Sequence, residues 1–108
     1  MNYIEEKMIE LAKRVFKDID FDYYETIPLK AKYKQNEKLI MHPEVKNCWT
    51  VSCKWFDPDF LDGMDKSGFL IIDDDTGEPV VLILATGGGG NCVIAKDSKG
   101  KYYVERNY

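Results

Sequence analysis

The chain has 108 residues, of which 44% are hydrophobic and 31% charged, and its formal net charge is −4. This length fits a single domain over residues 1–108, with a core that needs neither a metal nor a disulfide. No apolar run approaches the ~20 residues that span a bilayer, so no membrane association is expected. The charged residues near the start do not fit a signal peptide, so we expect a cytoplasmic protein.

The negative charge lies mainly in the second half of the chain. Residues 1–54 carry ten basic and nine acidic side chains, whereas residues 55–108 carry five basic and ten acidic ones. Acidic surface repels phosphate backbones, so nucleic acid is not expected as a partner, and a basic protein is. Alternatively, a net charge this small only keeps the protein in solution.

The pattern of residues 3–19 predicts an amphipathic helix. Its apolar residues recur every three or four positions and form one stripe, which comprises Ile4, Met8, Leu11, Ala12, Val15, Phe16 and Ile19. Asn2 is positioned to cap the first turn, and Glu5 three residues later completes a capping-box pattern. We expect the stripe to pack across a sheet.

The next predicted element is a strand over residues 27–34, where apolar residues alternate with lysines. Pro28 favours an edge strand, and the lysines would protect that edge from unwanted pairing. The edge could pair across a dimer, but the lysines oppose this, so we expect a monomer or a weak dimer. A short strand is also predicted over residues 39–41.

Residues 47–55 then form an alternating strand that places Trp49, Val51, Cys53 and Trp55 on one side. Cys48 and Cys53 point to opposite faces of this strand and cannot pair, so the cysteines are expected to be reduced. Four further strands are predicted near residues 68–73, 79–85, 91–96 and 101–106. Their connections are short and contain glycine, as hairpins require. The fold class is therefore α+β: an N-terminal helix on a bent antiparallel sheet of five or six strands.

Three patterns that could carry chemistry do not fit it closely. The run Gly87–Gly90 leads into a strand and lacks the Lys-Ser/Thr of a phosphate loop. The aspartates from Asp57 onward fail the register of a calcium loop, which needs oxygen ligands at positions 1, 3 and 5. His42 has no metal ligand or nucleophile at a suitable spacing. We therefore predict no catalytic residue, no metal and no cofactor.

Aromatic and acidic residues meet at the end of the 47–55 strand. Trp55 and Phe56 lead directly into a loop that contains Asp57, Asp59, Asp62 and Asp65. An aromatic anchor inside an acidic rim is the mixture expected of a binding site for a basic partner. Alternatively, Trp55 and Phe56 close the core of the sheet.

The chain also resembles a known family. The N-terminal helix, the strand segment Trp49-Thr50-Val51 and the segment Gly68–Asp73 leading to Asp75-Thr76-Gly77-Glu78 are similar to cystatin-like or NTF2-like proteins. Within that group they resemble the small immunity proteins of bacterial polymorphic toxin systems. The chain departs from the pattern by a further hairpin over residues 92–108 and by the loop at residues 57–66.

The resemblance implies a non-enzymatic protein that binds and neutralises a toxin, often a nuclease, made by the same cell. It transfers no catalytic residue. Two alternatives stay open: an NTF2-like small-molecule binder or minor enzyme that uses a cone between helix and sheet, and a general protein-interaction module. A binder of small molecules would need an open cavity of at least ~300 Å³ in that cone.

Overall fold

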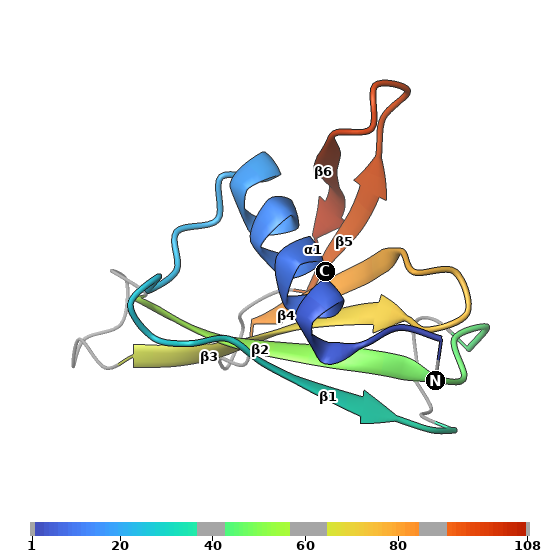
Figure 1. Ribbon diagram of the computed structural model, residues 1–108. Coiled ribbons are helices and arrows are strands. Elements are labelled where there is room, and N and C mark those ends of the chain that lie inside the picture. Colours follow the sequence, from blue (N-terminus) through green and yellow to red (C-terminus); the bar gives the residue numbers. More distant parts are fainter. Residues whose placement is uncertain (1, 37–42, 57–64, 85–90, 108) are drawn as a thin grey trace.

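A computed structural model describes residues 2–36, 43–56, 65–84 and 91–107, and it has the predicted α+β fold. One helix packs on an open antiparallel sheet of six strands (Figure 1). In chain order the elements are α1 (Glu5–Asp18), β1 (Lys30–Lys34), β2 (Cys48–Phe56), β3 (Asp65–Asp73), β4 (Pro79–Leu84), β5 (Asn91–Lys96) and β6 (Tyr102–Asn107). Among the described residues, no helix is long and apolar enough to span a membrane.

The sheet is a meander in which each strand pairs with the next one in the chain, from β1 at one edge to β6 at the other. The pairing register shifts between Ile71 and Ile72 and again between Val93 and Ile94. Such bulges bend a sheet and increase its twist. In Figure 1, β5 and β6 accordingly rise at an angle from β1, β2 and β3, and α1 lies within that angle.

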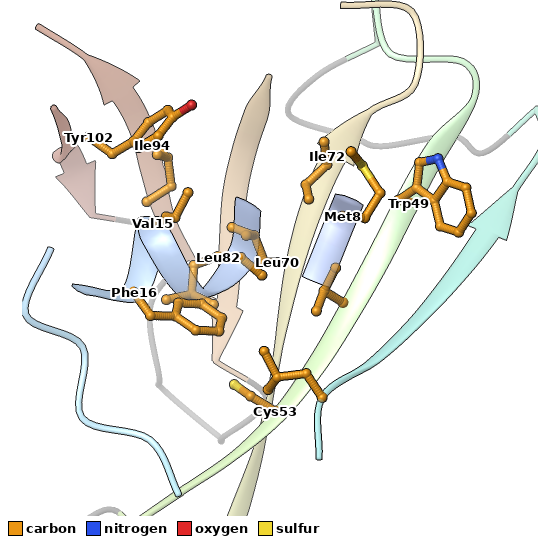
Figure 2. Close-up of a cluster of buried hydrophobic side chains, with 13 residues drawn as sticks. Met8, Val15, Phe16, Trp49, Cys53, Leu70, Ile72, Leu82, Ile94 and Tyr102 are labelled. Atoms are coloured by element: carbon orange, nitrogen blue, oxygen red, sulfur yellow. The ribbon is translucent and has the colours of Figure 1, made fainter. Parts of the chain in front are cut away.

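The apolar stripe of α1 forms the core together with one face of the sheet. Met8, Ala12, Val15 and Phe16 are buried on the helix. They pack against alternate residues of the strands (Figure 2), including Trp49, Val51, Cys53, Leu70, Ile72, Leu82, Ile94 and Tyr102. The sequence predicts this packing, because buried residues recur at every second position of a strand and about every 3.6 positions of a helix. We call this side of the sheet the inner face and the opposite side the outer face.

The predicted cap of the helix is wrong. Ile4 occupies the N-cap position, and no side chain caps the first turn. Asn2 instead bonds to Asp74, which lies 72 positions away. Its backbone N–H donates to both carboxylate oxygens at 3.0 and 2.9 Å, and its side-chain amide donates to the Asp74 carbonyl at 3.1 Å. The helix begins two residues later than a cap at Asn2 requires, so the Asn2 side chain bonds to Asp74 and not to the first turn.

Among the residues whose burial is described, Asp74 is the buried charged one, with 1% of its surface exposed. Besides Asn2, the indole N–H of Trp49 donates to its carboxylate at 2.9 Å, and its own backbone N–H donates to the carbonyl of Asn47 at 3.0 Å. A buried carboxylate is tolerated when hydrogen bonds replace its hydration. Asp74 thus joins the start of the chain, the β3–β4 turn and the beginning of β2.

A second set of contacts holds α1 against β6. Asp18 accepts a hydrogen bond from the backbone N–H of Tyr102 at 3.1 Å, and Arg14 donates to the carbonyl of Gly100 at 2.8 Å. The Arg14 guanidinium also lies 5.3 Å from the centre of the Tyr102 ring, within the range of a cation–π interaction. The helix is therefore fixed both at its beginning and in its last turn.

Strand boundaries differ from the predictions by more than one residue in two places. β1 begins at Lys30 rather than at residue 27, after Pro28, which cannot donate to a ladder hydrogen bond. β3 begins at Asp65, earlier than predicted, because it stays paired with β2 along its whole length. The short strand predicted over residues 39–41 lies outside the described residues.

We expect Asp74→Asn to lower the free energy of unfolding by about 2–4 kcal/mol, because one charged acceptor is lost and an amide N–H₂ is turned toward existing donors. Urea denaturation followed by tryptophan fluorescence measures this change. Asp75→Asn is the matched control: its side chain is exposed, so a change within about 0.5 kcal/mol is expected. Equal stability of the two variants would contradict the role assigned to Asp74.

Candidate functional site

The site begins where α1 ends. The N–H of Phe21 donates to the carbonyl of Phe16 at 2.8 Å, and the N–H of Asp20 donates to that of Lys17 at 3.2 Å. This pair of bonds is the Schellman motif, in which the residue after the cap takes a left-handed conformation. That residue is Asp20, with φ of 56°, which aspartate tolerates better than most residues. The turn directs Phe21 back onto the helix.

The motif brings four aromatic rings together at this end of the core. The ring of Phe21 lies 5.2 Å from that of Phe16, and the ring of Tyr23 lies 4.9 Å from Phe16. Phe21 also meets Trp55 of β2, with ring centroids 5.9 Å apart and planes tilted by 53°. Tilted pairs at such distances are favourable. Trp55 is therefore joined to the segment after α1, which is distant from it in sequence.

A backbone bond fixes this segment against β2. The N–H of Tyr24 donates to the carbonyl of Lys54 at 2.9 Å. The segment carries three exposed carboxylates at Asp20, Asp22 and Glu25, next to half-buried aromatic rings. We define the aromatic–acidic surface as Asp20, Phe21, Asp22, Tyr23, Glu25 and Trp55. In Figure 1 the segment lies at the end of the sheet where β2 finishes and β3 begins.

The surface is hollowed beside the helix. An open depression of about 620 Å³ is lined by Phe16, Phe21 and Tyr23 together with the three carboxylates, and by Lys13 and Lys17 on the helix side. Lysine ammonium groups thus border one side of the depression and carboxylates the other. The arrangement can anchor an apolar side chain among the rings while orienting charged groups around it.

The indole N–H of Trp55 is buried, and none of the described residues accepts a hydrogen bond from it. An unsatisfied buried donor costs about 1–3 kcal/mol. Native proteins carry few such groups, and a strained geometry, a bound water or a functional role accounts for each of them. Trp55 is half-buried as a whole, so part of its ring reaches the surface.

Two ionisable groups beneath the surface stay neutral over a wider pH range than usual. Burial raises the pKa of the Cys53 thiol from 9.0 to about 11. Burial is also the main reason that the pKa of Tyr23 is raised, and the nearby carboxylate of Glu25 adds to it. Desolvation disfavours the charged form of each group, so neither side chain is activated as a nucleophile or base at neutral pH.

The predicted partner-binding residues are placed only in part. Trp55 lies in the aromatic–acidic surface. Phe56 ends β2, and Asp65, predicted in a loop, is the first residue of β3 and pairs with Phe56; their side chains are outside the description. Asp57, Asp59 and Asp62 lie outside the described residues, as do His42 and Gly87–Gly90. Among the described residues, no group of three or more His, Cys, Asp or Glu side chains could hold a metal.

The acidic segment from Asp20 to Glu25 is the part that the sequence analysis did not assign to the site. A signal for it exists in the sequence. An aspartate directly after the apolar helix stripe, followed by a phenylalanine, fits a left-handed helix end with an apolar contact back to the helix. The contact between Phe21 and Trp55 could not be predicted from a local sequence pattern, because the two residues are 34 positions apart in the chain.

The chain matches no protein-family model, no curated protein and no solved structure in these three comparisons. Exposed carboxylates around half-buried aromatic rings are chemically suited to noncovalent recognition, because rings can supply apolar area and carboxylates can attract and orient a cation.

The raised pKa of Cys53 predicts a loss of stability in alkali. The folded thiol keeps its proton up to about pH 11, whereas the unfolded thiol loses it near pH 9.0, so stability falls between these values. The expected slope from this group is up to about 1.4 kcal/mol per pH unit. Urea denaturation of the wild type and of Cys53→Ala from pH 8 upward measures the difference. Parallel stability curves for the two proteins would contradict the prediction.

Proposed function

We propose that this protein is a non-enzymatic binding protein whose aromatic–acidic surface receives a basic protein, and more specifically an immunity protein. In this proposal it acts in the cytoplasm as a monomer or weak dimer. It neutralises a toxin, such as a nuclease, made by the same cell. The observation that carries the proposal is the contact of Trp55 with Phe21, which joins the end of β2 to exposed carboxylates from another part of the chain.

Charge supports the direction of binding. Asp20, Asp22 and Glu25 lie on the segment that borders Trp55. The sequence that follows β2 also contains Asp57, Asp59 and Asp62. A basic partner would be attracted by these groups, and complementary charge speeds association. The half-buried rings then supply the apolar contact that holds the complex.

The indole N–H of Trp55, which has no acceptor among the described residues, also favours this surface over others. A partner that carries a carbonyl or hydroxyl group could supply the missing acceptor after a small movement of the ring. The small-molecule alternative lacks comparable support, because Phe16, Leu70 and Leu82 fill the space between α1 and the inner face (Figure 2). The resemblance to immunity proteins suggests a toxin as the partner, and the aromatic–acidic surface is where we propose that the toxin binds.

Capture from native lysate with a tagged chain, eluted by rising salt, tests this proposal. We expect one basic protein in stoichiometric amount whose toxicity on expression is suppressed by this chain. Asp22→Lys with Glu25→Lys should weaken its binding at least about tenfold, mainly through slower association. Asp75→Lys with Glu105→Lys changes the net charge equally at exposed positions elsewhere and serves as the control.

A second pair of substitutions tests the segment beyond β2. Asp59→Lys with Asp62→Lys should slow association of the captured protein and reduce its dependence on salt. Association rates at several salt concentrations measure both effects. Unchanged rates would remove these two aspartates from the interface.

The control pair Asp75→Lys with Glu105→Lys decides whether the aromatic–acidic surface is the site. If this pair weakened binding as much as Asp22→Lys with Glu25→Lys, the aromatic–acidic surface would not be the site.

A further inference from the structure

The outer face of the sheet has a different character from the aromatic–acidic surface. Along β1, Ala31 and Tyr33 turn toward the core, so Lys30, Lys32 and Lys34 project from the outer face and are exposed. α1 lies on the other side of β1, β2 and β3 (Figure 1). Within the described residues, no helix covers the lysine side, and Val45 packs on part of it against Cys48, Ile71 and Val81.

The register shows what lies beside these lysines. Lys30 pairs with Ser52, which pairs with Phe69, and Lys32 pairs with Thr50, which pairs with Ile71. Phe69 in turn pairs with Ile83 of β4. Each row therefore runs from an ammonium group at the sheet edge, across a hydroxyl, to an apolar side chain.

Two neighbouring depressions follow this arrangement. One of about 370 Å³ is lined by Lys32, Lys34, Thr50, Phe69, Ile71 and Ile83. The other, of about 280 Å³, includes Lys30, Lys54 and Phe69 in its lining. Both depressions border Ser52 and Phe69, so they adjoin along the outer face; we call them together the groove, with the lysines of β1 on one side and Phe69 and Ile83 on the other.

The positive charge of this groove is not neutralised within the described part of the chain. The ion pairs found there are Lys7–Glu10, Arg14–Asp18 and Lys96–Glu78, and none involves a lysine of β1. Lys54 donates to the hydroxyl of Ser67, a neutral partner, at 2.6 Å. Asp73 lies in the row of Lys34, with Cys48 between them, and none of these ion pairs includes it. The groove is therefore cationic on a protein whose net charge is −4.

We propose that this groove binds an acidic, extended segment of a partner protein. Alternate residues of an extended chain repeat at roughly 6.6–6.8 Å, which is also the spacing of Lys30, Lys32 and Lys34 along β1. Acidic residues at alternate positions would face the lysines, and the apolar residues between them would face Phe69 and Ile83. This inference is independent of the proposed function, because it uses a different surface and the opposite charge.

A protein segment fits the groove better than a nucleic acid. The wall opposite the lysines is apolar, and it offers contact to aliphatic side chains but nothing to a phosphate backbone. A long polyanion would also be repelled by the negative net charge, whereas a short acidic segment meets mainly the local lysines. The chemistry that recognises the partner is thus a carboxylate row alternating with apolar side chains.

The probe is a fluorescent ten-residue peptide in which glutamate and leucine alternate, and its binding to the full chain is measured by fluorescence anisotropy. We expect saturable binding at about 50 mM salt that weakens at about 150 mM. The same peptide with lysine in place of glutamate should not bind. A single-stranded DNA oligonucleotide of ten nucleotides, measured in parallel, should bind more weakly than the acidic peptide.

Two variants locate the binding. Lys30→Ser with Lys32→Ser and Lys34→Ser should weaken peptide binding at least about tenfold. Lys7→Ser with Lys99→Ser and Lys101→Ser makes the same change of net charge at exposed positions elsewhere and should leave binding within about twofold. Thr50→Glu places a carboxylate inside the groove and should also weaken binding at least about tenfold. Thermal melting confirms that each variant is folded.

Each remaining outcome overturns the proposal. Absence of peptide binding at low salt would do so, as would equal weakening by the control variant. Tighter binding of the oligonucleotide would assign the groove to phosphate backbones instead. If the β1 lysine variant self-associates yet keeps its affinity for the peptide, the lysines serve only to protect the sheet edge.

Discussion

The buried carboxylate of Asp74 is the constraint on which the rest of the fold depends. It accepts hydrogen bonds from the backbone of Asn2 and from the indole of Trp49, and it sits in the turn that joins β3 to β4. These groups come from three separate parts of the chain. The position of Asn2 fixes where α1 starts over the sheet, so the apolar stripe of the helix meets the inner face in one register. The core in Figure 2 follows from that placement.

With the beginning of the helix fixed, its end determines where the aromatic–acidic surface forms. The left-handed conformation of Asp20 returns Phe21 to the helix and leaves the following carboxylates exposed.

The exposure of the outer face also depends on where the helix lies. Because one helix covers only the inner face, the alternation along β1 leaves its lysines exposed beside Phe69. The protein thus presents an acidic surface with aromatic rings at one end of the sheet and a cationic groove on the outer face.

Much of this fold was predictable from local patterns. The stripe from Met8 to Phe16 identified the helix, and the alternation around Val51 identified β2 and its inner side, because both periods follow directly from backbone geometry. The hairpin connections identified the meander. Pro28 and the lysines correctly placed β1 at an edge of the sheet.

The features that escaped prediction are contacts between distant positions. Asn2 resembles a helix cap, yet its partner lies 72 residues away, and no local pattern encodes that choice. Asp73, Asp74 and Asp75 look alike in sequence, but Asp73 bonds within the turn and Asp74 is buried. The candidate site likewise combines a local and a distant feature. Trp55 was predicted to belong to a binding site from its neighbours in the chain, whereas its contact with Phe21 depends on tertiary structure.

Hydrogen exchange of the Asn2 backbone amide, measured by NMR on the full chain, tests the central claim most directly. An amide this close to the start of a chain normally exchanges freely. If Asp74 holds it in the buried network, it should exchange at least about a hundredfold more slowly than in an unfolded peptide, as the indole N–H of Trp49 should too. Exchange of the Asn2 amide at the unfolded rate would contradict the account, because the start of the helix would then not be anchored by Asp74.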